Sequence, residues 1–403
     1  MLLVDPVRLA RRQLELDRER TARFPHLFAY KAARMVASPL ALLRGSAPLF
    51  YELLARHPAL TEGFPGEGWI VGDAHVENFG AYRAGILTVR ETSRSHAREP
   101  IVFDLNDFDD ALVGPWRLDV LRLVTSMLLA GRESEDGTAT LSQCDALIDA
   151  YVRAAIGTKR APAQPRCVVA LVEKVRSRTR KQLLDARTQV VDGQRRFVLG
   201  PRYEPLPPKL RAKAERAFCK YTARLAKAER VPPEALEVLD VAFRVAGTGS
   251  LGGLRIAVLV RGKGGVDGGW IFDMKAEGKP SASILARKPG LEPGDRVCAA
   301  LRACLTQYPR MIGSTRIRGE SMFVRRLTPQ EDKLDLARIS PEDAVPLARC
   351  LGALLGAAHR RGATRAPKVP WTDKQCGRLV HHAVALAGIH EAMYLAYCDL
   401  VRR

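Results

Sequence analysis

The segment VGDAHVENFG, residues 71 to 80, places four hydrogen-bonding side chains between apolar flanks. Asp73 and Asn78 have the D-x-x-x-x-N spacing of a phosphoryl-transfer loop. In such a loop the aspartate accepts the proton of the substrate hydroxyl, and the asparagine carboxamide binds magnesium. We therefore expect Asp73 to be the catalytic base and Asn78 a metal ligand. His75 and Glu77, which lie between them, are expected to orient or brace the loop.

A second group of acids follows in IVFDLNDFDDALVGP, at Asp104, Asp107, Asp109 and Asp110. Carboxylates gathered beside one apolar strand repel each other unless a cation is present. Mg²⁺ meets that need, because it prefers one or two carboxylates together with phosphate oxygens. The alternative is structural: the acids cap the helix around Leu118 and pair with Arg117 or Arg122.

A glycine-rich segment lies much later in the chain and matches G-x-G-x-x-G, as Gly247, Thr248, Gly249, Ser250, Leu251 and Gly252. It falls between two predicted strands, which favours a hairpin over phosphates rather than a dinucleotide-binding turn before a helix. Glycine suits this position because a Cβ would keep the backbone amides away from phosphate oxygens. An ordinary flexible hairpin is the alternative.

The strand after this hairpin ends in FDMK, with Lys275 as its last residue. Protein kinases keep the lysine that binds the α- and β-phosphates of ATP on the equivalent strand. The alternative is a lysine at a strand end that faces solvent. Kinases also pair this lysine with a glutamate on the next helix, but the helix predicted over about 294 to 307 has none. Glu277 and Glu292 are the nearby candidates.

The periodicity of apolar residues predicts an α+β chain. Helices are expected over much of 1 to 68 and over 115 to 131, and short strands such as GILTV (85 to 89) and IVFDL (101 to 105) lie between them. Residues 241 to 327 read as three strands, a helix and two strands, and helices follow from 341. This order predicts a large helical lobe over 1–240, a small β-rich glycine-loop lobe over 241–335, and helices over 336–403 that return to the large lobe.

Composition excludes several classes of protein. The 403 residues carry eight cysteines without a Cys-x-x-Cys pair, which argues against a zinc ribbon or a disulfide framework and for reduced thiols in the cytoplasm. The charged N-terminus lacks the apolar stretch of a secretory signal, and no window resembles a membrane span. His359, His381, His382 and His390 lack metal-ligand spacing, so surface or helix-packing roles are expected for them.

The net charge of +20 is concentrated in residues 157 to 230, which hold 20 Lys and Arg against 6 Asp and Glu. Such a block can bind nucleic acid, but it can also be a solvated helical surface. It offers few aromatic residues for stacking on bases, namely Phe197, Tyr203, Phe218 and Tyr221. Nucleic-acid binding is therefore possible but not favoured.

The motifs GDAHVENFG and DFDDALVGPWRLDV resemble those of the aminoglycoside phosphotransferases and related kinase-like proteins. The resemblance implies that Asp73 is the base, that Asn78 and Asp107 bind the metal, and that Asp119 braces the loop backbone. Val71 departs from the pattern, because these phosphotransferases usually carry histidine there. More closely, the chain resembles a mainly bacterial family of uncharacterised proteins, domain of unknown function 2252, through RMVASPLALLRGSA, AGTGSLGGLRIAVLV and FVRRL as well.

In kinases the glycine loop and the lysine precede the catalytic loop, whereas here they follow it. The resemblance therefore implies a two-lobed, protein-kinase-like fold that is circularly permuted, which is tolerable because chain ends generally lie at surfaces. The expected function is an ATP- and Mg²⁺-dependent phosphotransferase with an unidentified hydroxyl acceptor, a small molecule by analogy. The alternatives are a catalytically weak or inactive nucleotide-binding, pseudokinase-like module and a basic nucleic-acid-binding protein.

Overall fold

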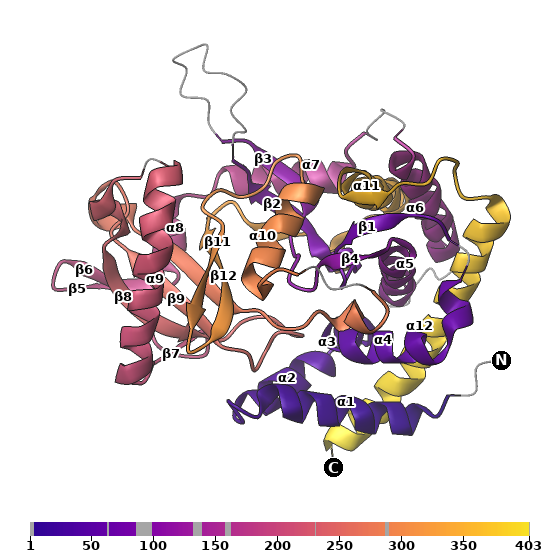
Figure 1. Cartoon of the computed structure of the whole chain (residues 1–403), viewed down its shortest axis with the longest axis horizontal. Coiled ribbons are helices and arrows are strands. Elements are labelled where there is room, and N and C mark those ends of the chain that lie inside the picture. Colours follow the sequence, from indigo (N-terminus) through magenta and orange to yellow (C-terminus); the bar gives the residue numbers. More distant parts are fainter. Residues whose placement is uncertain are drawn as a thin grey trace, which may run out of the picture.

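A computed structural model describes residues 4–62, 64–85, 99–131, 139–157, 163–229, 231–286 and 290–402. It shows a mixed α+β protein with several antiparallel sheets, so the predicted α+β class is confirmed. The six-stranded sheet and helix α9 lie at one end of the molecule, and helices α5, α6, α11 and α12 lie at the other (Figure 1). Most of the strand predicted over residues 85 to 89 lies outside the described residues.

The first half of the chain supplies helices and two small sheets. Its helices are α1 (Pro6–Thr21), α2 (Leu27–Met35), α3 (Pro39–Gly45), α4 (Ala47–Arg56), α5 (Arg117–Gly131) and α6 (Ala139–Ala155). Its strands are β1 (Glu67–Ile70), β2 (Phe79–Arg83), β3 (Ile101–Leu105) and β4 (Leu112–Pro115). β1 pairs with β4 and β2 with β3, so the segments 71–78 and 106–111 leave the ends of neighbouring antiparallel strands.

The middle of the chain contributes helices and strands that pack on both faces of the large sheet. It comprises α7 (Arg166–Arg176), α8 (Arg180–Asp185), β5 (Thr188–Val191), β6 (Gln194–Phe197), β7 (Tyr203–Glu204) and α9 (Pro208–Glu229). β5 and β6 form the hairpin that VDGQRRF predicts, with positive φ angles of 48° at Asp192 and 75° at Gly193. Phe218 and Tyr221 of α9 are buried against Phe272 of the sheet.

The six-stranded sheet curls into a half-barrel with the strand order β11-β12-β10-β9-β8-β7. Its remaining strands and its helix are β8 (Val238–Arg244), β9 (Arg255–Val260), β10 (Trp270–Ala276), α10 (Pro293–Cys304), β11 (Gly313–Ile317) and β12 (Glu320–Leu327). The predicted order of three strands, a helix and two strands is confirmed. Side chains alternate across each strand, so Phe272 and Met274 enter the apolar core under α9 while Asp273 and Lys275 lie on the opposite face.

The last segment returns to the first half of the chain. It contains β13 (Asp332–Lys333), α11 (Pro341–Arg361), β14 (Ala363–Arg365) and α12 (Asp373–Arg402). β13 pairs with β2 and β14 pairs with β1, while α12 packs on α1 and α5. The helices at the two ends of the chain are therefore neighbours, and both ends lie on the same side of the molecule (Figure 1). The lobe boundaries at 240 and 335 stay a prediction.

One described helix, α12, is long and apolar enough to cross a membrane by length and composition alone. A single helix of this kind is weak evidence, because a helix packed in a soluble protein passes the same test. α12 buries Leu379, Leu386, Met393 and Tyr397 against the rest of the chain. In this structure α12 packs against α1 and so holds the two ends of the chain together.

Candidate functional site

A cavity of about 530 Å³ lies between the sheet and the loops that follow β1 and β3. It is lined by all but one of the predicted site residues, namely Asp73, Asn78, Asp107, Gly247, Thr248, Gly249, Ser250 and Lys275. The exception is Gly252, where a Cβ would meet the backbone oxygen of Arg20 at 2.5 Å. Segments about 170 positions apart in the sequence thus line one space.

The loop after β1 is held from behind by Asp119, the third residue of α5. Its carboxylate accepts hydrogen bonds from the backbone N–H groups of Val71, at 2.6 Å, and Gly72, at 2.9 Å. The brace expected of Asp119 is confirmed, although residue 71 is valine. Gly72 has a φ of +78°, and a Cβ there would meet the Asp110 backbone oxygen at 2.0 Å. Glycine is therefore required at this turn.

His359 of α11 extends this brace. Its Nε2 lies 3.0 Å from Asp119 Oδ2, and its Nδ1 lies 3.0 Å from the hydroxyl oxygen of Tyr151. All three side chains are buried. The sequence predicts only a surface or packing role for this histidine, because nothing in its spacing links it to a loop almost 300 positions earlier. The fold brings α11 behind the loop.

Asp73 is fixed by a buried arginine. Arg122 Nε donates to Asp73 Oδ1 at 2.6 Å, and Arg122 Nη2 also donates to the Leu43 backbone oxygen at 2.8 Å. Burial raises the pKa of Asp73 to about 7, against the opposing effect of Arg122. A carboxylate with a pKa near neutrality suits a general base, because it is ionised at working pH and still binds a proton well. Arg122 thus pairs with Asp73 rather than with the later acids.

Asn78 turns its amide back toward the same loop. Its Nδ2 donates to the Asp73 backbone oxygen at 2.6 Å, which leaves the carbonyl Oδ1 as the group that can face a cation. His75 Nδ1 accepts from the Glu77 backbone N–H at 3.2 Å, in agreement with the predicted orienting role. Glu77 forms an ion pair with Arg44 at 2.6 Å. Hydrogen bonds within the loop and to α3 therefore fix its shape.

The four later acids divide between three environments. Asp107 lines the cavity and accepts only a long bond of 3.4 Å from the Asp109 backbone N–H, within the described residues. Asp110 accepts from the Ser281 N–H at 2.8 Å and the Ser281 hydroxyl at 3.1 Å. Asp104 is absent from the cavity lining, and burial raises its pKa to about 6. The structural alternative is not supported in the described residues, because Arg117 donates to the Phe64 backbone oxygen and Arg122 to Asp73 rather than to these acids. Asp107 keeps free acceptor capacity.

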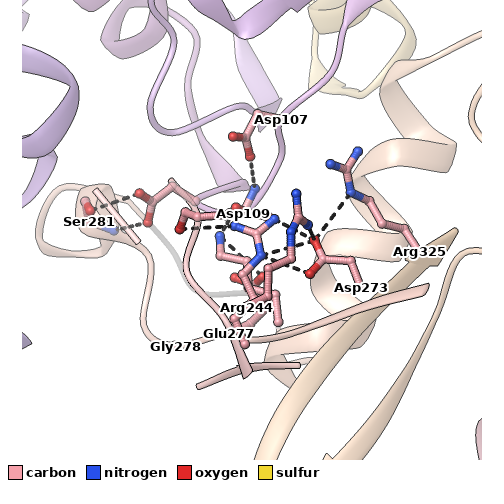
Figure 2. Close-up of polar contacts among 12 residues, drawn as sticks. Asp107, Asp109, Arg244, Asp273, Glu277, Gly278, Ser281 and Arg325 are labelled. Carbon is pink, nitrogen blue, oxygen red and sulfur yellow. Dashed lines mark hydrogen bonds and ion pairs between the residues drawn. The ribbon is translucent and has the colours of Figure 1, made fainter. Parts of the chain in front are cut away.

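Lys275 of β10 pairs with Asp109 and lies 3.6 Å from Glu277. Of the two glutamates that the sequence offers, Glu277 is the neighbour, whereas Glu292 pairs with Arg316 at 3.1 Å. Burial raises the pKa of Glu277 to about 7, and Lys275 opposes that shift. Figure 2 shows Glu277 and Asp109 close together beside the sheet.

Helix α10 contacts the acidic segment through Arg296 rather than through a glutamate. The buried guanidinium donates to the Asp109 backbone oxygen at 2.8 Å and also to the backbone oxygen of Ala111. A third bond reaches the Gly278 backbone oxygen at 3.2 Å. Arg296 thus fixes the loop after β3 and the segment after β10 to the same helix. The sequence gives no signal for this, because the bonds are to backbone atoms.

The glycine-rich segment is fastened to α2. Lys31 Nζ donates to the backbone oxygens of Thr248, at 3.1 Å, and Gly249, at 3.3 Å. Lys31 is itself paired with Asp17 at 3.4 Å, and both side chains are 2% exposed. Since the carbonyl and the following N–H of a peptide point in opposite directions, these bonds turn the amides away from α2. The segment is an anchored loop that lines the cavity.

The residues that sequence reasoning missed lie on the sheet. Asp273 sits between three arginines, with 2.5 Å to Arg244, 2.5 Å to Arg255 and 4.0 Å to Arg325. Burial alone would raise the pKa of Asp273, but Arg244 and Arg255 outweigh it and hold it well below its usual range. Figure 2 shows Arg244 and Arg325 converging on Asp273. Charged residues at the inward positions of four neighbouring strands, β8, β9, β10 and β12, were the available signal.

The described side chains alone would not complete the coordination of a metal ion, so a bound ligand would have to supply further oxygen atoms. Within the described part of the chain, no group of three or more His, Cys, Asp or Glu side chains is arranged to hold an ion. Asn78 Oδ1 and the Asp107 carboxylate offer two oxygen donors on one cavity wall. Mg²⁺ commonly takes one or two protein ligands and fills its remaining positions with phosphate oxygens and water. The donor set therefore fits magnesium bound together with a phosphorylated ligand.

The basic block from 157 to 230 does not present its aromatic residues. Phe197, Tyr203, Phe218 and Tyr221 are all buried in the core around the sheet. They cannot stack on bases without unfolding that core. The described residues of the block expose charge together with scattered apolar side chains such as Val190, Val198 and Leu199, which is typical of a solvated protein surface.

A sequence profile of a protein family, described as "Uncharacterized protein conserved in bacteria (DUF2252)", matches residues 23–400. The match spans nearly the whole chain, from the end of α1 to the end of α12. No curated protein and no solved structure matches the chain.

Proposed function

The chain belongs to the DUF2252 family, and we propose that it is an ATP- and Mg²⁺-dependent phosphotransferase that acts on a hydroxyl group of a small molecule. One observation carries the proposal: Asp73, Asn78 and Asp107 line the same cavity as Gly247–Ser250 and Lys275. Phosphoryl transfer asks a protein chiefly for positioning and for compensation of charge. Loop amides, an ammonium group, a carboxamide and carboxylates facing one space can supply both.

A permuted, kinase-like fold is the finer proposal for the architecture. It is supported by the hairpin between β8 and β9, the lysine on β10, and the order α10, β11, β12 and α11 that follows. It is also supported by β14, which takes the chain from α11 to an edge of β1, the strand that leads into the Asp73 loop. The packing of α1 on α12 brings the two chain ends together, as a permutation requires.

The chemistry follows from the residues at hand. Asp73, held by Arg122 at 2.6 Å, accepts the proton of the acceptor hydroxyl as its oxygen attacks the terminal phosphorus of ATP. Lys275 and the loop amides bind the phosphate oxygens, and Asn78 and Asp107 would hold the metal. When bound, Mg²⁺ neutralises charge that develops on the phosphate oxygens. The bond to the leaving ADP oxygen breaks, and the acceptor becomes a phosphate ester.

A second candidate is a nucleotide-binding module without transfer activity. It is favoured by the ion pair between Lys275 and Asp109, which occupies the lysine, and by Arg296 on the helix where kinases carry a glutamate. Binding of nucleic acid is less favoured, because the aromatic residues of the basic block are buried. A cytoplasmic location and the absence of a membrane span stay predictions.

The test is isothermal titration of the full chain with ATP and MgCl₂, followed by a transfer assay on a panel of hydroxylated small molecules. We expect saturable binding that Lys275→Met weakens by about tenfold or more, because a charged contact to phosphate is lost. Lys181→Met is the matched control, since Lys181 pairs with Asp185 on the surface at 60% exposure. Wild-type chain that binds no ATP would contradict the proposal, and binding without transfer to any acceptor would favour the second candidate.

A further inference from the structure

The concave face of the six-stranded sheet carries a row of charged side chains. Lys275 is paired in register with Arg255 of β9, and Asp273 with Arg325 of β12. Side chains directly opposite each other on neighbouring strands have Cβ atoms about 5 Å apart. Arg255, Arg325, Asp273 and Lys275 all line the cavity. The proposed phosphate lysine is therefore flanked along β9 and β10 by charged groups, while Phe323 of β12, opposite Lys275, adds an apolar side chain to the same lining.

Three guanidinium groups share one carboxylate at this end of the cavity. Arg244, Arg255 and Arg325 surround Asp273, and Glu331 forms an ion pair with Arg325 at 3.5 Å. Asp107 and Glu277 also act on Arg255 from the loop side. Arg244 Nε is buried and has no hydrogen-bond acceptor in the described part of the chain. Buried guanidinium groups that share one carboxylate leave donors for a further oxyanion.

Lys333 adds a cation with no fixed partner. It belongs to the short strand β13 and lines the cavity, and its ammonium group makes no hydrogen bond or ion pair with a described residue. Burial lowers its pKa, while Asp107 raises it and Arg44 and Arg325 lower it further. An ammonium group in such a place loses hydration without gaining a protein partner. That arrangement is typical of a group that awaits an anionic ligand.

We infer that Arg255, Arg325 and Lys333 form an oxyanion subsite, with Asp273 as its internal counter-ion, which binds a further phosphate group of the same ligand whose other phosphate oxygens contact Lys275. The inference rests on the proposed function, since it places the second group in the same cavity. The ligand is a condensed phosphate chain recognised at both ends by charge. That chain can be the triphosphate of a nucleotide or a free polyphosphate, and the base contributes little to affinity.

The test compares three probes in the presence of MgCl₂: ATP, inorganic tripolyphosphate and adenosine. We expect tripolyphosphate to bind within about threefold of ATP, and adenosine not to compete with either, because recognition is by charge. Lys333→Met and Arg325→Met should each weaken binding of tripolyphosphate by about tenfold. Lys174→Met is the control, since Lys174 lies nearby on the surface at 65% exposure and pairs with Asp332 at 3.2 Å.

The two variants are chosen to leave the fold intact. The ammonium group of Lys333 makes no bond with a described residue, and Arg325 is the most distant of the three arginines from Asp273, so thermal unfolding should stay close to wild type. Asp273→Asn is the reciprocal variant: removing the counter-ion should tighten binding of tripolyphosphate, an effect that a merely structural cluster would not produce.

The outcomes separate the two proposals. Binding of tripolyphosphate that depends on Lys333 and Arg325, without binding of ATP, supports the subsite and contradicts the ATP-dependent function. Binding of ATP that depends on Lys275 but not on Lys333 or Arg325 overturns the subsite and leaves the function in place. Tight binding of adenosine alone also overturns the subsite. If no probe binds, both proposals fail.

Discussion

The two walls of the cavity are built by different means. The loop wall, residues 71–78 and 106–111, gets its shape from buried groups behind it, chiefly Asp119, Arg122 and Arg296. The sheet wall gets its shape from strand register, which places Arg255, Asp273 and Lys275 on one face, and from ion pairs at the surface of that face. Changes behind the loop should therefore alter geometry, whereas changes on the sheet should alter charge and leave geometry intact.

The largest expected effect is on the loop wall. Asp73→Asn keeps the shape of the side chain but removes the proton acceptor, so transfer should fall by about 10²–10⁴-fold. ATP binding should change little, because Asp73 is expected to face the acceptor rather than the phosphates. Single-turnover transfer and titration with ATP on the same preparation measure both quantities. A variant that retains full transfer activity would remove Asp73 from the mechanism.

A smaller effect is expected one layer behind the loop. Asp119→Asn replaces one carboxylate oxygen by an NH₂ group, which then faces a backbone N–H instead of accepting from it. The substitution also removes the negative charge, so both hydrogen bonds, to Val71 and to Gly72, are weakened. The free energy of unfolding should fall by about 3 kcal/mol, the size of one hydrogen bond to a charged group. Urea denaturation measures this, with Asp149→Asn on the exposed face of α6 as the control, for which less than about 0.5 kcal/mol is expected. Equal losses in the two variants would show that the brace contributes nothing.

The smallest effect is the dependence on pH. Because the folded pKa of Asp73 is about 7, the ionised base is lost as pH falls below 7, and transfer should drop about tenfold per pH unit there. The contribution of Asp73 to the free energy of unfolding should change in the opposite direction, so that it decreases as pH rises. The folded chain binds this proton more tightly than the unfolded chain, so this group's contribution is largest below pH 4 and is lost as pH rises from about 4 through 7. Asp73→Asn should remove that slope, and an unchanged slope would assign it to another group.

The sequence predicted the parts of this arrangement that local patterns encode. The order of strands and helices over 241–327 follows from alternation and from turn residues, and the hairpin at Asp192 and Gly193 follows from its dipeptide. The spacing of Asp73 and Asn78, and the apolar strand before Lys275, were enough to nominate residues that line one cavity. Each of these signals is local, because the residues that form it lie within a few positions of each other in the chain.

The parts that could not be predicted depend on contacts between distant segments. His359 meets Asp119 because α11 packs against α6, and Arg296 binds backbone oxygens, which carry no residue type to recognise. Asp109, rather than a helix glutamate, meets Lys275 because the loop after β3 reaches the sheet. Gly252 was nominated for phosphate binding, but its contact is with the end of α1. In each case tertiary packing decides what the local pattern leaves open.

The contact between His359 and Asp119 has a consequence for biosynthesis. Ribosomes add about 5–20 residues per second, so the histidine emerges roughly 15–60 s after the Asp73 loop. During that interval the acids and Arg122, which are buried in the complete fold, lack the helix and the sheet that later surround them. The site can therefore close only after the C-terminal third of the polypeptide has been synthesised.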